Sequence, residues 1–172
     1  MLFRSVVDIT DSSDQIERVR GRVVEMAAVG MQIADRRLEF ERFADDEIVL
    51  VAPPKTALDV PDVLAPTDLA RFPILSREAG SATRQVVEDA LAGVAPSPLV
   101  LGSLEAVKNA VLAGAGLAFL SRHAVTSELK RGELRQVSVS GVSLRRSLYV
   151  VRLRERDASP ALVALRRYLL GA

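Results

Sequence analysis

The order of apolar and polar positions along the chain predicts short strands that alternate with helices. The stretch 100–121 shows this order most fully. An apolar run ends at Gly102, and Ser103 stands where the N-cap residue of a helix belongs. Apolar residues then recur at helical spacing until Gly114-Ala-Gly116, after which a second apolar run begins at Leu117. The stretch therefore predicts a strand–helix–strand crossover, the βαβ unit of α/β proteins.

The same patterns predict the elements in the rest of the chain. Period-two alternation and continuous apolar runs predict strands, whereas helical spacing behind a polar cap predicts helices. Because the two kinds of element alternate and several predicted strands are apolar throughout, we expect an α/β fold with mostly parallel strand pairing. The proline-rich residues 53–66 are expected to form a connecting loop. The further strands are expected at 3–9, 23–29, 38–43, 47–52, 73–76, 134–139 and 147–153, and the further helices at 11–20, 68–71 behind Thr67, 80–91, from near 121, and 160–170.

Length and composition limit the class of protein. The chain has 172 residues, of which 49% are hydrophobic and 26% charged, so it can bury one core or two small cores that share a hinge. A formal net charge of +1 gives no overall field that attracts nucleic acid or a membrane. The absence of cysteine excludes disulfides and thiolate metal sites. No apolar stretch is long enough to span a membrane and the first residues form no signal peptide, so we expect a soluble, cytoplasmic protein.

Hydroxyl side chains stand at the start of three predicted helices, each of which follows a predicted strand. Because the carboxyl ends of parallel strands line one crevice of an open α/β sheet, these helix starts are expected to converge there. Each offers backbone N–H groups, a hydroxyl and the positive end of a helix dipole, which suit a small carboxylate, phosphate or sulfate. The alternative is that all are ordinary N-caps that stabilise the fold by ~1 kcal/mol each. Three together favour a binding site, formed by Ser12 and Ser13, Ser81 and Thr83, and Ser103.

The sequence offers little for catalysis. His123 is the single histidine, in Ser121-Arg-His-Ala124, and is better explained as a surface residue than as a general base. No Gly-x-Ser-x-Gly elbow is present, and no acidic pair has the spacing of metal ligands. The glycines at Gly114-Ala-Gly116 end a helix rather than open one, unlike a dinucleotide-binding loop. We therefore predict no enzyme, no catalytic residue, no cofactor and no metal.

Several segments taken together resemble a known family. The resemblance is to the effector-binding domain of LysR-type transcriptional regulators, and it covers nearly the whole chain. Each segment alone is weakly specific, whereas their order and spacing are specific. The segments are 75–84, 102–121 and 128–134, supported by 46–54, 147–151 and the helix that begins at Ser159-Pro-Ala161.

The resemblance implies the fold of type 2 periplasmic binding proteins, in which two α/β subdomains are joined by two crossing strands and the effector is bound in the cleft between them. Subdomain I would contain residues 1–52 and 148–172, and subdomain II residues 53–147. Ser12 and Ser13 would face the cleft from subdomain I. Ser81 and Thr83 would face it from subdomain II, with Ser76 and Arg77 nearby and Ser103 slightly further from the ligand.

The chain also departs from the family pattern. Members carry an N-terminal winged helix-turn-helix and a linker helix that this sequence does not contain, and the first strand and helix of subdomain I are expected to be missing. DNA would then be contacted only through a helix-turn-helix domain absent from this chain. The function implied is that of a ligand-sensing module, active as a homodimer, that binds a small anionic effector. The alternatives are a solute-binding receptor of the same fold, an enzyme built on this scaffold, and a remnant that only dimerises.

Overall fold

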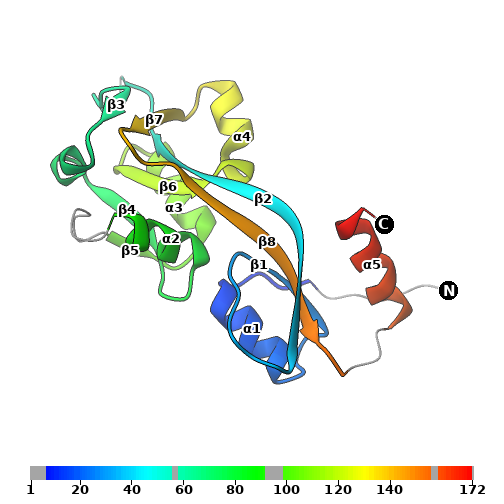
Figure 1. The fold of residues 1–172 in the computed structure, drawn as a ribbon. Helices are drawn as coiled ribbons and strands as arrows, with labels where there is room; N and C mark the ends of the chain where they lie inside the picture. Colours follow the sequence, from blue (N-terminus) through cyan, green and yellow to red (C-terminus); the bar gives the residue numbers. More distant parts are fainter. Residues whose placement is uncertain (1–6, 56–57, 92–98, 156–158, 172) are drawn as a thin grey trace. The chain divides into compact units, whose positions relative to one another are not determined.

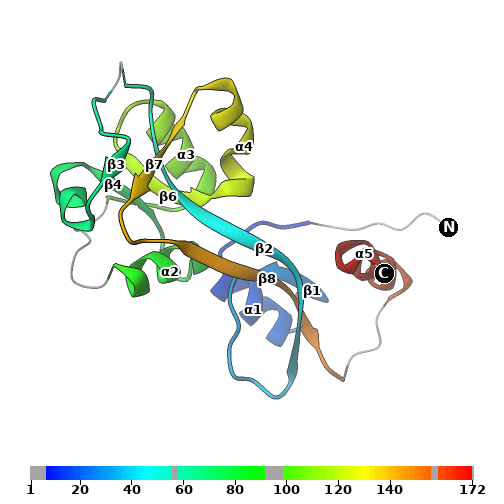
Figure 2. The same cartoon turned by 45° about the horizontal axis from the view of Figure 1, so that its top comes forward.

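The computed structural model describes residues 7–55, 58–91, 99–155 and 159–171 (Figures 1 and 2). The chain divides into two compact units. Unit 1 contains Met1–Asp45 and Ser147–Ala172, and unit 2 contains Asp46–Arg146. The long strands β2 (Leu38–Ala52) and β8 (Leu144–Leu153) contribute residues to both units.

Unit 1 packs one helix against a small sheet. The apolar face of helix α1 carries Ile16 and Val19, which are buried together with Val29 and Val151 of the sheet. Strand β1 pairs antiparallel with β8, and β8 lies between β1 and β2. The elements are α1 (Ser12–Arg20), β1 (Met26–Val29), the first part of β2, the last part of β8 and α5 (Pro160–Leu170).

Helix α5 is held to unit 1 by polar contacts. Ser159 caps the helix, and its Oγ also donates to Glu25 Oε2 at 2.9 Å. Arg166 Nε donates to Glu41 Oε1 at 2.7 Å. No residue within α5 is buried. The helix predicted at 160–170 is therefore present, but its apolar side chains are not part of the core of unit 1.

The sheet of unit 2 is buried on both faces. Along β2, Ile48 and Leu50 belong to one hydrophobic cluster, and the alternate residues Val49 and Val51 belong to another. Helix α2 contributes to the first cluster, whereas α3 and α4 contribute to the second. Because side chains of a strand alternate between faces, a sheet covered on both sides requires a continuous apolar run, which is what 48–52 shows. The elements are β3 (Val63–Leu64), the 3₁₀ helix η1 (Pro66–Arg71), β4 (Ile74–Arg77), α2 (Ala82–Ala90), β5 (Leu99–Leu101), α3 (Leu104–Leu112), β6 (Leu117–Ser121), α4 (Arg122–Arg131) and β7 (Arg135–Val139).

Strand pairing in unit 2 is mixed. β4 pairs parallel with both β5 and β6, and β3 pairs parallel with β7. β2 pairs antiparallel with β6 on one side and with β7 on the other. The expected parallel pairing is therefore found among β4, β5 and β6 and between β3 and β7, whereas β2 departs from it. The chain enters unit 2 along β2, before the crossovers begin. In this unit β2 therefore runs antiparallel to both of its partners, β6 and β7.

Several predicted elements differ from the structure. No strand forms at 7–9, where Val7 and Ile9 are 85% and 90% exposed, and residues 3–6 of that prediction lie outside the described residues. The strand predicted at 23–29 begins only at Met26, after a turn in which Arg22 has a φ of 61°. The two strands predicted at 38–43 and 47–52 form the single strand β2. Helix η1 begins earlier than 68, and its N-cap is Ala65 rather than Thr67.

Candidate functional site

Two predicted site serines cap helices that begin past the same edge of the unit 2 sheet. Ser81 Oγ accepts from Arg84 N at 3.5 Å at the start of α2, and Ser103 Oγ accepts from Ala106 N at 3.1 Å at the start of α3. These helices follow β4 and β5, which are parallel neighbours with Arg77 opposite Leu101. Both helix N-termini therefore follow the carboxyl ends of adjacent strands. Ser81 is buried, whereas Ser103 is exposed.

The other predicted residues of unit 2 lie in or beside the junction between β4 and α2. Thr83 is buried in the first turn of α2, and Ser76 is half-buried in β4. Arg77, the last residue of β4, makes two hydrogen bonds to Glu78, from Nε to Oε2 at 2.8 Å and from Nη2 to Oε1 at 2.5 Å. Their side chains are 13% and 24% exposed, and Arg77 lowers the pKa of the Glu78 carboxyl by this hydrogen bonding. The guanidinium of Arg77 is thus already paired with a carboxylate.

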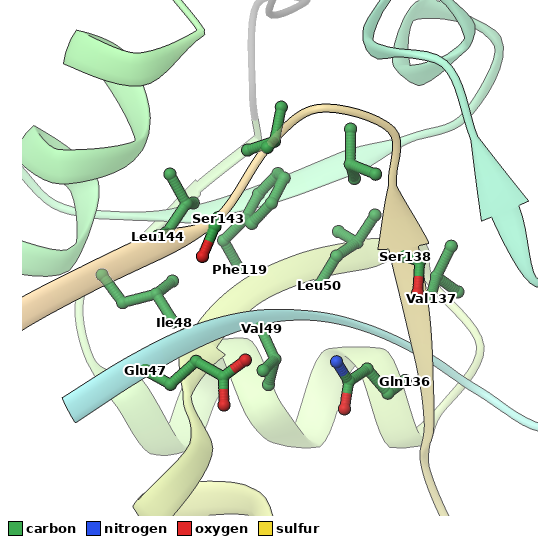
Figure 3. A pocket seen from close by; sticks show the side chains of 12 residues that line it. Glu47, Ile48, Val49, Leu50, Phe119, Gln136, Val137, Ser138, Ser143 and Leu144 are labelled. Carbon is green, nitrogen blue, oxygen red and sulfur yellow. The ribbon is translucent and has the colours of Figure 1, made fainter.

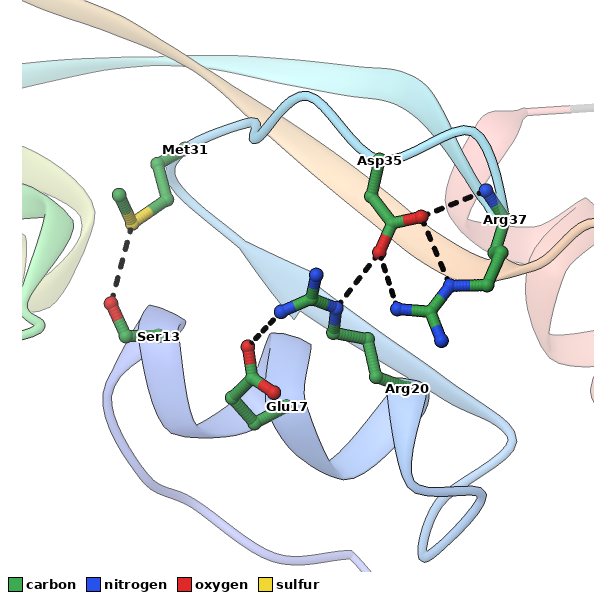
Figure 4. A network of polar contacts seen from close by, with 6 residues as sticks. All are labelled: Ser13, Glu17, Arg20, Met31, Asp35 and Arg37. Carbon is green, nitrogen blue, oxygen red and sulfur yellow. Dashed lines mark hydrogen bonds and ion pairs between the residues drawn. The ribbon is translucent and has the colours of Figure 1, made fainter.

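Ser12 and Ser13 lie in the first turn of α1, but neither of them is its N-cap. The N-cap of α1 is Asp11, whose Oδ1 accepts from Asp14 N at 3.0 Å. A carboxylate at this position accepts a free N–H of the first helical turn, as a serine hydroxyl would. Ser12 Oγ instead accepts from Gly30 N at 3.2 Å. Ser13 Oγ donates to the sulfur of Met31 over 3.9 Å (Figure 4). Both serines thus connect α1 to the chain after β1.

A network of charged side chains connects the end of α1 to the loop before β2 (Figure 4). Asp35 accepts from Arg20 Nε at 2.8 Å and from Arg37, whose Nη2 lies 2.9 Å from Asp35 Oδ2. The Asp35 side chain is 8% exposed. Hydrogen bonds from Arg37, and then from Arg20, hold the pKa of Asp35 below its usual range. This network has a carboxylate for each arginine and stabilises the loop before β2 rather than offering free positive charge.

A buried polar cluster at the third strand–helix junction of unit 2 was missed from the sequence. Ser121, the last residue of β6, precedes α4 without capping it through its side chain. Its Oγ donates instead to Asp46 Oδ1 at 2.8 Å. Arg146 donates to Asp46 Oδ2 from Nε at 2.9 Å, and its Nη2 lies 2.8 Å from the same oxygen. Because Asp46 and Arg146 are 100 residues apart, no local pattern identifies the pair.

A pocket of about 220 Å³ lies within unit 2 (Figure 3). The apolar side chains of Leu50, Phe119 and Leu144 line it, together with the polar side chains of Glu47 and Gln136. No residue predicted for the site lines this pocket. A pocket formed by side chains from β2, β6, β7 and the start of β8 leaves no periodic signal in the sequence.

Other chemistry has limited support among the described residues. His123 is exposed in the first turn of α4. No group of three or more acidic or histidine side chains in the described ranges could hold a metal ion. In the same ranges, no helix has both the length and the hydropathy needed to cross a bilayer.

Comparison with known proteins identifies the family. Residues 4–172 match the family described as LysR substrate binding domain. This chain belongs to that family. The LysR regulatory domain of CcmR from Synechocystis PCC6803, solved in complex with 2-PG, superimposes with a TM-score of 0.80 at 27% identity, over 94% of this chain and 79% of that one. The fold is therefore that of type 2 periplasmic binding proteins, as the sequence resemblance predicted.

Two curated relatives that match this LysR domain are longer than this chain. It is 30% identical over 168 residues to the RuBisCO operon transcriptional regulator of Allochromatium vinosum, covering 96% of this chain and 56% of that protein. It is 39% identical over 164 residues to the phosphonates import ATP-binding protein PhnC of Anaeromyxobacter dehalogenans, covering 92% of this chain and 33% of that protein. The chain thus spans between a third and just over half of the length of these relatives.

Proposed function

We propose that this LysR domain is the effector-sensing part of a transcriptional regulator and that its effector is a small anion. The observation that carries the proposal is the pair of capped helices in unit 2, α2 and α3, which begin after the carboxyl ends of the adjacent parallel strands β4 and β5. DNA would be contacted by a helix-turn-helix domain outside this chain.

Helix N-termini favour negative charge for a physical reason. The first backbone N–H groups of a helix have no intrahelical acceptor, and the helix dipole places partial positive charge there. Ser81 and Ser103 each accept one such N–H, and the neighbouring ones point in the same direction. Two helix starts on one edge suit a ligand with several acceptor oxygens, such as a phosphate, a phosphonate or a carboxylate. Ser76, Arg77 and Thr83 are the further residues that we assign to this side of the site.

The names of two relatives suggest compounds to test. The CcmR regulatory domain was solved with 2-PG, and a third of the relative named for phosphonate import matches this chain. Phosphonates therefore belong in the first set of compounds to test, together with 2-PG.

We further propose that residues 1–52 and 148–172 act as subdomain I, with Ser12 and Ser13 as its effector-binding residues, and that residues 53–147 act as subdomain II. An effector that binds one arrangement of the subdomains more tightly shifts the population towards it. In a homodimer, that shift would reach the DNA-binding domains of both subunits.

The proposal is tested by isothermal titration of the protein with 2-PG, methylphosphonate and inorganic phosphate. The decisive variants are Ser103→Asp and Ser103→Asn, because both residues cap helices well and differ mainly in charge. If an anion is bound beside α3, Ser103→Asp should weaken binding roughly tenfold through like-charge repulsion, whereas Ser103→Asn should change it little.

The same pair of substitutions at Ser13 tests the contribution of unit 1. Ser13 has a weak contact to Met31, so neither substitution removes a strong bond. The absence of saturable binding for all three anions would contradict the proposed effector class. If the aspartate and asparagine variants of a residue bind the anions equally well, that residue is not part of the site.

A further inference from the structure

The strands β2 and β8, which link the two units, each contain a stretch without buried residues. In β2, residues 39–45 are all half-buried or exposed, and burial resumes at Asp46. In β8, residues 145–149 are all half-buried or exposed, and burial resumes at Val150. The boundary between the units crosses β2 at the end of its stretch and β8 within its stretch. Because backbone with few buried contacts opens most easily, a hinge is expected in these stretches.

On the unit 2 side, the stretches end at the buried cluster of Asp46, Arg146 and Ser121. Asp46 accepts from Arg146 Nε at 2.9 Å and from Ser121 Oγ at 2.8 Å, and the Asp46 side chain has no solvent exposure. Ser121 belongs to β6, which pairs antiparallel with β2. The cluster therefore joins both linking strands to a third strand of the unit 2 sheet. Since a slip of β8 along β2 would leave the buried carboxylate without its counter-charge, the ion pair also fixes the register of these strands.

On the unit 1 side, the stretches end at an aromatic contact. The rings of Phe40 and Tyr149 meet edge to face, with their centroids 6.4 Å apart and their planes at 88°. Both rings pack against the hydrophobic cluster of unit 1. Between this contact and the buried cluster, Ser147 Oγ donates to Asp45 Oδ1 over 3.3 Å in an exposed position. An exposed hydrogen bond of this length competes with water, so it restrains the strands less than the contacts at either end.

We propose that the ion pair of Asp46 and Arg146 positions the hinge of this LysR domain. It holds both linking strands to unit 2, so that bending is confined to residues 41–45 of β2 and 147–148 of β8. The consequence for sensing rests on the proposed function, because an effector can shift the arrangement of the subdomains only if the strands between them bend. Asp46 and Arg146 are positioning residues in this scheme and do not contact the effector.

The test measures how widely the distance between the two units varies in the full chain without ligand. The sequence contains no cysteine, so Ala34→Cys in unit 1 and Ser127→Cys in unit 2 provide two exposed positions for nitroxide spin labels. Double electron–electron resonance then gives the distribution of distances between the labels. The double variant Asp46→Leu/Arg146→Met replaces the ion pair with apolar side chains of similar size, and should widen this distribution about 1.5-fold or more.

A matched control removes a similar ion pair that does not touch the linking strands. Lys108 Nζ lies 3.2 Å from Glu128 Oε1 between α3 and α4, and these side chains are 13% and 12% exposed. Lys108→Met/Glu128→Gln should leave the width of the distribution unchanged. Arg146→Lys keeps the charge but not the two-nitrogen contact with Asp46, and should give an intermediate width. This single variant decides the question if circular dichroism shows that Asp46→Leu/Arg146→Met does not fold.

The proposal is overturned if the variants of Asp46 and Arg146 have the same width as wild type, or if the Lys108 and Glu128 control widens as much as they do. Titration with 2-PG separates this result from the proposed function. If wild type binds no 2-PG, that ligand is excluded as the effector, while the label distances still decide where the hinge lies. If 2-PG binds, its Kd should rise roughly threefold or more in Asp46→Leu/Arg146→Met, because a broader population contains less of the binding arrangement. An unchanged Kd would contradict the positioning role.

Discussion

Asp46→Ala is expected to destabilise the protein more than any substitution of a neighbouring acidic residue. The Asp46 side chain has no solvent exposure, and Ser121 and Arg146 both donate to it. Removing the carboxylate leaves the guanidinium of Arg146, which is only 13% exposed, without its buried counter-charge. The hydroxyl of Ser121 also loses its acceptor.

The magnitude follows from these contacts. Breaking a buried ion pair by removing one partner costs about 3–5 kcal/mol, because the remaining charge stays in a medium that solvates it poorly. Arg146 retains a little contact with water, so we expect about 3 kcal/mol, near the lower end of that range. Asp46→Asn preserves the shape and one acceptor oxygen, and should cost less.

Urea unfolding followed by circular dichroism measures the free energy of unfolding for wild type and variants. Asp45→Ala is the matched control, since Asp45 is adjacent, its side chain is 66% exposed, and its ion pair with Arg42 lies at the surface. Exposed pairs contribute about 0–1 kcal/mol, so the control should stay within about 1 kcal/mol of wild type. Equal losses for Asp46→Ala and Asp45→Ala would refute the reasoning.

Two further predictions concern other parts of the chain. Gly116→Ala should cost about 2–4 kcal/mol, because the added Cβ would lie 2.4 Å from the carbonyl oxygen of Pro73, whereas Gly102→Ala adds a methyl group to open space and should change the melting temperature little. Asp35 has a folded-state pKa below its unfolded value, so its contribution to stability is present above about pH 4 and is lost as the pH falls further. Urea midpoints at neutral and acidic pH should show a smaller loss for Asp35→Asn than for wild type, and an identical loss would contradict this assignment.

Local patterns in the sequence were sufficient to predict where several helices begin. The serines predicted as caps at Ser81, Ser103 and Ser159 each accept the backbone N–H of the third residue after them. A capping bond is formed within one turn, so the residues that make it are close in the sequence. Where two candidates for the cap lay side by side, as at Asp11 and Ser12, the pattern alone did not choose between them.

Strands and buried polar pairs depend on partners that are distant in the sequence. The alternation at 7–9 gave the pattern of a strand, yet none forms there. The polar break that divided 38–52 into two predicted strands contains Asp46, which β2 accommodates because Arg146 neutralises it. The residue that interrupted the apolar pattern is therefore the one whose partner lies in β8.

The charges beside the capped helices restrict how an anionic effector can be held. Arg77 is paired with Glu78, and Arg84 Nε donates to Glu88 at 2.7 Å. An anion at this edge would therefore have to displace a carboxylate before it could use either guanidinium fully. The first turn of α2 contains no acidic residue, whereas the first turn of α3 contains Glu105, which is paired with Lys108. Selectivity would then depend on the number and geometry of the acceptor oxygens more than on net charge, and a tetrahedral phosphonate should bind more tightly than a planar carboxylate of similar size.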